Sequence, residues 1–277
     1  MNIVLDFLGE LFTKRLEFGT IAGYRSAISA YHKPIDGVRV GQHPLVSCLM
    51  KGVSNERPPL PRYRYIWNVE TVLQKLRELP NNTELDRKTL THKTAALLGL
   101  CAPNRGNELH ALDEKFMSKM EGLETYYKCA FHGRVKHSRV GKQNPTVSFY
   151  QFSSDPKLCP VACIDEYIRR TKLDRSENKT TQLWLATKKP FNPVTKSTVT
   201  KWVLKILKLS GIDTNKFKGH SVRSASTSNV ANKGLELADI LSMGNWSGES
   251  VWQKYYHKEV EITPAQRYQK SLLGGPK

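Results

Sequence analysis

The sequence predicts a mainly α-helical protein with a small antiparallel β-sheet, divided into two domains. Apolar residues recur at helical spacing through most of the 277 residues, and the period shortens toward two only between residues 124 and 152. Residues 57–65, RPPLPRYRY, interrupt the pattern with three prolines and three arginines. Proline stiffens the chain and removes hydrogen-bond donors, so this segment is predicted to be a linker. A chain of this length can bury two cores.

Residues 1–56 are predicted to form a helical domain. Residues 3–12 place their apolar side chains on one helical face, and Thr20 is a suitable cap for a second helix in which Ile21 and Ile28 recur on one side. A third helix is expected from Pro44, in its first turn, to Gly52. The outer face of the second helix carries short polar and basic groups suited to phosphates and base edges, namely Arg25, Ser26, Ser29 and His32. An ordinary solvated face explains the same pattern equally well.

Residues 66–277 are predicted to form the larger domain. Helices are expected over 69–79 and 90–100, and the second is apolar nearly all round, which predicts burial. A break at 102–104 follows, and a new turn begins at Arg105. Glu108 stands three residues further on, where it can pair with or orient a neighbouring basic group.

The alternating segment at 124–152 predicts a hairpin or small antiparallel sheet with a long connection, HGRVKHSRVGKQNP. This connection has almost no apolar anchor, so a mobile basic loop is expected, and its cations are Arg134, Lys136, Arg139 and Lys142. Further helices are predicted over 159–171 and 197–210, the latter capped by Ser197.

The charge balance points to a polyanionic partner. Forty-three lysines and arginines face 25 acidic residues, a formal net charge of +18, which favours nucleic acid. An anionic membrane is the alternative, but no apolar run approaches the roughly 18 to 20 residues of a spanning helix. The N-terminus lacks the features of a signal peptide, so an intracellular protein is expected. Five scattered cysteines suit reduced thiols, and their spacing does not predict a metal site.

The stretch from Gly219 to Lys258 concentrates side chains capable of chemistry. It places His220 and Arg223 three residues apart, continues with about thirty residues of amphipathic helical pattern, and ends on adjacent tyrosines at 255 and 256. A His-x-x-Arg pair alone is commonly an exposed surface pair, and a tryptophan such as Trp246 is more often a core anchor. The order of these residues along the chain is more specific than any one of them.

That order resembles the tyrosine recombinases, the phage-type integrases and their relatives. The family pattern of Arg, Lys, His-x-x-Arg, His-or-Trp and Tyr is matched in turn by Arg105, Lys136, His220, Arg223, Trp246 and Tyr256. Longer words, among them YRSAISAYH, VGQHPLV, RPPLPRY, CPVACIDEYI and NWSGESVWQKYY, are similar more narrowly to the recombinases of DIRS-like and Ngaro-like retrotransposons and of Cryptons. The resemblance implies the tyrosine-recombinase catalytic fold over 66–277, preceded by a truncated, helical core-binding domain over 1–56.

The resemblance also implies a chemistry. A tyrosine phenol, with an ordinary pKa near 10, needs a cationic environment or a base to become a nucleophile. Arg105 and Arg223 would clamp the phosphate, His220 would donate a hydrogen bond or accept the phenol proton, and Lys136 would protonate the leaving 5′ oxygen. Trp246, where many relatives have His, would pack and donate its indole N–H. No metal or other cofactor is expected, because the guanidiniums supply the positive charge.

Two neighbouring tyrosines compete for the role of nucleophile. The general family spacing, nine positions after the His-or-Trp, selects Tyr255, whereas the retrotransposon-like pattern with one more residue selects Tyr256. We favour Tyr256. Adjacent helical positions point about 100° apart, so only one faces the phosphate, and the other is expected to pack in the core.

The predicted function is therefore site-specific DNA recombination through a 3′-phosphotyrosyl intermediate, without metal or ATP. The expected partner is double-stranded DNA, contacted also by Arg62 and Arg64 of the linker, and the expected assembly is a dimer on one site and a tetramer in synapsis. A eukaryotic source would place the protein in the nucleus. Two alternatives stay open: relaxation of supercoils by a type IB topoisomerase, and a non-catalytic DNA-binding protein derived from a mobile element.

Overall fold

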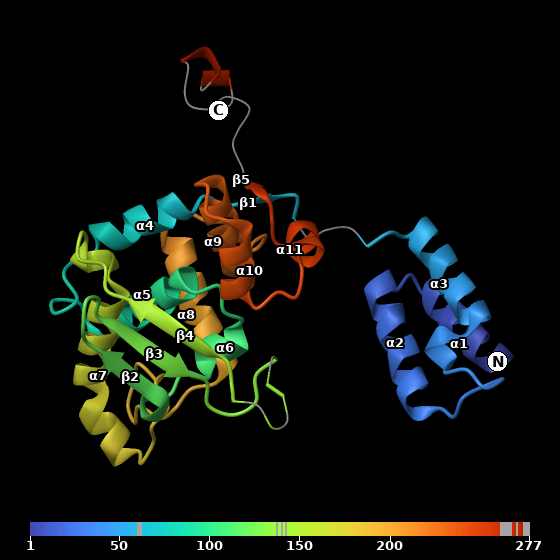
Figure 1. The fold of residues 1–277 in the computed structure, drawn as a ribbon, viewed down its shortest axis with the longest axis horizontal. Helices are drawn as coiled ribbons and strands as arrows, with labels where there is room; N and C mark the ends of the chain where they lie inside the picture. The colour runs from blue at the N-terminus through green and yellow to red at the C-terminus, as the bar shows by residue number, and fades with distance from the viewer. Residues whose placement is uncertain are drawn as a thin grey trace. The chain divides into compact units, whose positions relative to one another are not determined.

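The computed structural model describes residues 1–59, 63–136, 138–139, 141, 143–260, 268–269 and 271–273. The chain divides into two compact units, Met1–Arg62 and Tyr63–Lys277. The protein is mostly helical with a small antiparallel sheet, which confirms the predicted fold class (Figure 1).

The first unit packs its helices around one apolar cluster that includes Leu8, Ile21 and Val46. Its elements are α1 (Asn2–Thr13), α2 (Phe18–Tyr31), the 3-10 helix η1 (Val40–Gln42) and α3 (Pro44–Glu56). Pro44 occupies the first turn of α3, as predicted. The capping prediction for Thr20 is wrong, because α2 already begins at Phe18, which packs against the core.

Residues at both ends of the predicted linker belong to the folded units. The guanidinium of Arg57 donates to the carbonyls of Leu16 (2.7 Å) and Phe12 (2.9 Å), which closes the first unit behind α3. At the other end, Tyr65 lies in a strand of the second unit. Local composition identified the break in the helical pattern, but hydrogen bonds formed by tertiary contacts set its limits.

The second unit is built around two helices that are buried along most of their length, α5 (Arg87–Cys101) and α9 (Ser221–Asn232). Helix α5 packs against α7, α8 and α9, and this core includes Leu90, Leu97 and Trp184. The other helices of the unit are α4 (Val69–Glu78), α6 (Gly106–His110), η2 (Glu114–Phe116), η3 (Pro156–Leu158), α7 (Pro160–Glu177), α8 (Lys196–Leu209), α10 (Leu237–Gly244) and α11 (Glu249–Tyr255).

The second unit also contains two small sheets. Strands β2 (Met117–Met120), β3 (Tyr126–Ala130) and β4 (Thr146–Tyr150) form an antiparallel sheet in that order, side by side in Figure 1. Strands β1 (Tyr65–Ile66) and β5 (Glu259–Val260) pair in parallel and bring the start of the unit to the segment that follows α11. The sequence analysis missed β2, because its residues, MSKM, are largely exposed and lack apolar alternation.

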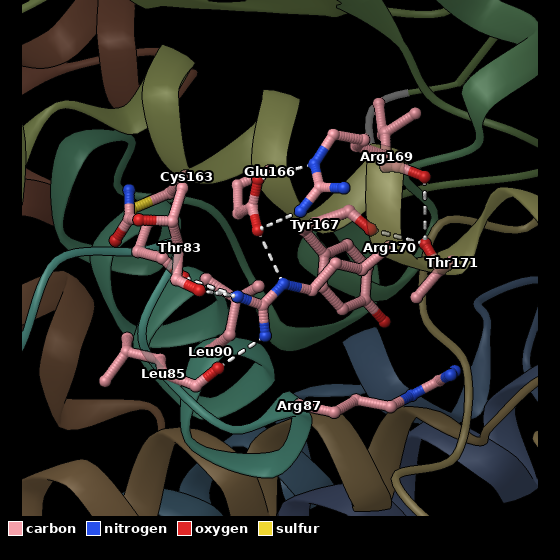
Figure 2. Close-up of polar contacts among 12 residues, drawn as sticks. Thr83, Leu85, Arg87, Leu90, Cys163, Glu166, Tyr167, Arg169, Arg170 and Thr171 are labelled. Carbon is pink, nitrogen blue, oxygen red and sulfur yellow. Dashed lines mark hydrogen bonds and ion pairs between the residues drawn. The ribbon is translucent and has the colours of Figure 1, made fainter.

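A charged cluster on α7 holds the N-terminal end of α5. Figure 2 shows the guanidinium of Arg170 between the Glu166 carboxylate and the carbonyls of Thr83 and Leu85, in the loop that leads into α5. Arg87, in the first turn of α5, pairs with Asp174 of α7. These bonds fix the helix whose other end leads to Arg105.

Helix α8 begins one residue before the predicted start. Thr195, in extended conformation, precedes the helix, and its hydroxyl bonds to the hydroxyls of Ser197 (2.9 Å) and Thr198 (3.2 Å). The prediction that Ser197 caps this helix is therefore wrong, because Ser197 already lies inside the first turn.

Candidate active site

Arg105 and Glu108 form a fixed pair where the chain turns from α5 into α6. The Glu108 carboxylate is 2 % exposed and accepts from the Arg105 main-chain N–H (2.7 Å) and from its guanidinium (3.0 Å). A buried carboxylate bound at two points of one arginine restricts the rotamer of that arginine. Glu108 was expected to pair with or orient a neighbouring basic group, and in the structure that group is Arg105.

Arg223 lies in the buried first turn of α9 and is itself 2 % exposed. Its guanidinium donates to the carbonyl of Pro103, before α6, and to that of Gly244, at the end of α10. Burial, and then the charge of Arg105, lowers the pKa of Arg223 to about 10, so the side chain stays protonated at neutral pH. Two cationic side chains in mutual repulsion create a site that favours an anion.

Trp246 lies against the guanidinium of Arg223, with 4.0 Å between the ring centroid and the guanidinium carbon. The turn that places it there starts at Asn245, whose φ of 51° is left-handed. Gly244 is required beneath the indole, because a Cβ at that position would fall 1.8 Å from Cζ3 of Trp246. The sequence Gly-Asn-Trp thus encodes a helix end that stacks an indole on an arginine.

Tyr256 completes the cluster from the first position after α11. Its ring centroid lies 4.7 Å from that of Trp246, 5.6 Å from that of His220, and 5.1 Å from the guanidinium carbon of Arg223. The exposed His220 stands immediately before α9. Four side chains separated in sequence by up to 36 positions therefore meet at one point.

Tyr255 lies outside this cluster. Its side chain is 58 % exposed, and the nearby charge is the ammonium of Lys254, 5.4 Å from the ring centroid. The expectation that the second tyrosine packs in the core is wrong for Tyr255. Helix α11 buries Trp252, and Tyr256, four residues later, continues that face, whereas Tyr255 does not.

Two N–H groups of the cluster are buried without a hydrogen-bond partner among the described residues. They are Nε of Arg223 and Nε1 of Trp246. Buried donors are rarely left unpaired, because losing water without a replacement costs free energy. These two donors are therefore available to an acceptor that is not part of the protein.

Lys136 lies exposed in the connection between β3 and β4. Within the described part of the chain it forms no hydrogen bond or ion pair with the cluster. In a connection expected to have almost no apolar anchor, Val135 is buried (4 % exposed), and Asn144 bonds to the carbonyls of Phe131 and Gly133. The loop therefore has a bonded base, and Lys136 is an exposed residue next to the buried Val135.

The remaining predicted DNA-binding residues divide into three groups. Arg64, Arg134 and Arg139 are exposed on the second unit. Arg62 and Lys142 lie outside the described residues. On α2 and just after it, Ser26 and His32 are exposed, Arg25 and Ser29 are half-buried, and the Ser29 hydroxyl accepts from Gly41 N (3.0 Å). Ser29 is thus partly committed to holding its own unit together.

The sequence analysis passed over two serines that contact the cluster from α9. The hydroxyls of Ser224 and Ser228 both donate to the main-chain carbonyl of Tyr256. The available signal was their spacing of four residues in the run SVRSASTSNV, beside Arg223.

Among the described residues, no group of three or more His, Cys, Asp and Glu side chains is placed to hold a metal ion. No helix in the described part of the chain is long and apolar enough to cross a membrane. All five cysteines are free thiols, and Cys129, Cys159 and Cys163 are buried whereas Cys48 and Cys101 are exposed.

Comparison with known proteins gives a family match and a set of similar folds. Residues 160–261 match the profile described as "Phage integrase family". The chain is similar to the XerH site-specific recombinase in a post-cleavage complex with palindromic difH substrate, at a TM-score of 0.58 and 15 % identity over 99 % of this chain and 71 % of that one. The search of curated proteins found no match.

Two further solved structures have a fold similar to that of this chain. The Tn1549 transposon integrase (residues 82–397) in complex with circular intermediate DNA gives a TM-score of 0.55 at 13 % identity, over 97 % of this chain and 83 % of that one. A λ integrase dimer bound to a COC′ core site gives 0.51 at 11 % identity, over 94 % and 67 %. The second unit has the tyrosine-recombinase catalytic fold. This fold and the family match, within which His220, Arg223, Trp246 and Tyr256 all lie, together support a tyrosine recombinase.

Proposed function

We propose that this protein is a site-specific DNA recombinase in which Tyr256 cleaves a phosphodiester and remains linked to the 3′ phosphate. The observation that carries the proposal is the meeting of the Tyr256 ring with Arg223, His220 and Trp246 beside the Arg105–Glu108 pair. A phenol, two guanidiniums and an imidazole are the groups that such a cleavage requires.

The arginines bind the phosphate and stabilise the charge that grows on its non-bridging oxygens. Arg223 is held at two carbonyls, so its position is set before DNA binds. The buried Nε of Arg223 and Nε1 of Trp246 supply donors without a protein acceptor in the described residues. Both donors are buried, so phosphate binding requires a small movement of the side chains around them.

The reaction moves one phosphoryl group and two protons. The Tyr256 oxygen attacks phosphorus, the bond from phosphorus to the 5′ oxygen breaks, and His220 accepts the phenol proton. Lys136, in the β3–β4 connection, gives a proton to the leaving 5′ oxygen. The phosphotyrosyl bond keeps the energy of the broken bond, so a 5′ hydroxyl from another strand reverses the step and joins new partners.

The proposed partner is duplex DNA, and strand exchange between two sites calls for a dimer on each site and a tetramer in synapsis. The net charge of +18 and the exposed Arg64, Arg134 and Arg139 support the DNA partner. The narrower similarity to the recombinases of DIRS-like and Ngaro-like retrotransposons and of Cryptons rests on the sequence words alone. It implies a mobile element as the source and a nucleus as the place of action.

Covalent trapping tests the proposal. The protein is incubated with a pool of nicked suicide duplexes of randomised sequence, and the DNA-linked peptide is mapped. We expect attachment at Tyr256, loss of the adduct in Tyr256→Phe, and an adduct within a few-fold of the wild type in Tyr255→Phe.

The same assay separates the alternatives. Attachment at Tyr255 would overturn the assignment of the nucleophile, and DNA binding with no adduct in any variant would favour a non-catalytic DNA-binding protein. Adducts accompanied by relaxation of supercoils, with no recombinants on paired sites, would favour a type IB topoisomerase.

A further inference from the structure

The main chain at Tyr256 is held by two buried hydroxyls. Ser224 is 1 % exposed and Ser228 is fully buried, and both donate to the Tyr256 carbonyl, Ser228 at 3.0 Å. The Ser228 hydroxyl also accepts from the main-chain N–H of Lys258 at 2.9 Å. Two residues of α9 thus bind the chain on both sides of position 257.

These contacts differ from what serine usually does inside a helix. A helical Ser or Thr hydroxyl commonly bonds back to a carbonyl three or four residues earlier. Their neighbours do so, because Thr227 donates to the Arg223 carbonyl at 2.8 Å and Ser226 to the same carbonyl at 3.3 Å. Ser224 and Ser228 reach across to another segment instead, so local helix chemistry does not account for them.

The other contacts of this segment tie it to α11: the N–H groups of Tyr256 and His257 donate to the Trp252 carbonyl (2.8 and 2.9 Å), and the His257 ring stacks on that of Trp252. Helix α11 is seven residues long, with Trp252 as its buried residue, and Tyr256 leaves the helix at φ −119° and ψ −36°. After Tyr256, the chain is next held at β5, which pairs with β1. Trp67, the residue directly after β1, bonds to Ser221 at the start of α9 (2.9 Å). Helix α9 therefore positions the segment at both of its ends.

We propose that Ser224 and Ser228 are positioning residues that select Tyr256 over Tyr255 as the nucleophile, and this inference rests on the proposed function. A shift of the chain by one position would bring Tyr255 to the cluster. The two hydroxyls lie on the helix that carries Arg223, which is proposed to bind the phosphate. They therefore hold Tyr256 next to a phosphate that is bound by the same chain. A displacement of the nucleophile of about 1 Å is enough to slow such a step on the order of a hundredfold.

The test compares Ser224→Ala, Ser228→Ala and the double variant with Ser226→Ala as the matched control. Ser226 lies on the same helix and is 7 % exposed, but its hydroxyl bonds within α9. The duplex recovered from the wild-type adduct serves as substrate at saturating protein. Four quantities are measured: the single-turnover rate of adduct formation, the DNA affinity, the melting temperature, and the identity of the linked tyrosine.

We expect the double variant to form adducts at least about tenfold more slowly, at unchanged DNA affinity, with part of the attachment moved to Tyr255. Ser226→Ala should match the wild type. A double variant that attaches only through Tyr256 at the wild-type rate would overturn the inference and leave the proposed function intact. If the double variant does not fold, Ser228→Ala alone decides by the same criteria. Absence of any adduct from the wild type would overturn both.

Discussion

The residues of the candidate site come from two regions, the packed helices and the β3–β4 connection, and these regions are held in different ways. Arg105, Arg223 and Trp246 sit on turns and helices of the packed core. The guanidiniums bond to Glu108 or to main-chain carbonyls, and the Trp246 indole stacks on Arg223. Lys136 lies exposed in the β3–β4 connection. The groups proposed to bind the phosphate belong to the core, whereas the proposed proton donor belongs to a loop. Changes in the packed part should therefore alter both stability and rate, and changes in the loop should alter rate alone.

Replacing Arg223 by Ala should have the largest effect. The change removes the guanidinium from the phosphate, and we expect cleavage to fall by at least about a thousandfold. It also leaves the carbonyls of Pro103 and Gly244 without their donor, so the melting temperature should fall as well. Adduct formation and thermal unfolding are measured on the same sample. Unchanged stability would contradict the structural role of this arginine.

Replacing Lys136 by Ala should slow cleavage by about a hundredfold, the usual contribution of a general acid, and leave stability unchanged. The matched control is Arg139→Ala, an exposed cation of the same loop. The measurement is the single-turnover rate at saturating protein, with a melting curve for each variant. Equal losses in the two variants would show that the loop contributes charge in general and would remove Lys136 from the reaction.

Replacing Glu108 by Gln tests the packed part without changing its shape. The half-buried Arg105 side chain would lose its anionic partner next to Arg223, so we expect the free energy of unfolding to fall by about 2 kcal/mol. Cleavage should fall by roughly tenfold, because Arg105 is then less firmly oriented. Chemical denaturation and the adduct assay measure the two effects. A loss of rate at full stability would indicate that Glu108 acts in the reaction itself.

The smallest effect concerns His92 of α5, which packs against Trp202 of α8. Burial lowers the pKa of His92 to about 4, from an ordinary value near 6.5. Between these values the unfolded chain binds a proton that the folded protein does not, so stability is lost as pH falls from about 6.5 to 4, by about 1 to 3 kcal/mol. Denaturation at several pH values should show this slope, and His92→Phe should reduce it. An identical slope in that variant would assign the pH dependence to other groups.

The outcome at several elements shows how far local patterns reach. Apolar periodicity located α3, α4 and α5 to within about one turn. The spacing of apolar residues reveals whether one face of a helix or the whole helix is buried. Periodicity failed for β2, an exposed strand held by pairing to β3. Residue type failed to locate the caps, which were wrongly placed at Thr20 and Ser197. Strand pairing and cap geometry depend on neighbours that lie far away in the sequence.

The sequence by itself determined the composition of the candidate site: its basic charge, the types of its residues and their order along the chain. Tertiary structure alone decided which side chains meet. It placed Tyr256 against Arg223 and left Tyr255 exposed, where the sequence offered two competing spacings. It also turned two ordinary helical serines toward the Tyr256 carbonyl. The physical reason is that residue type and spacing fix what a side chain can do, whereas the packing of α9 against the end of α11 fixes where it acts.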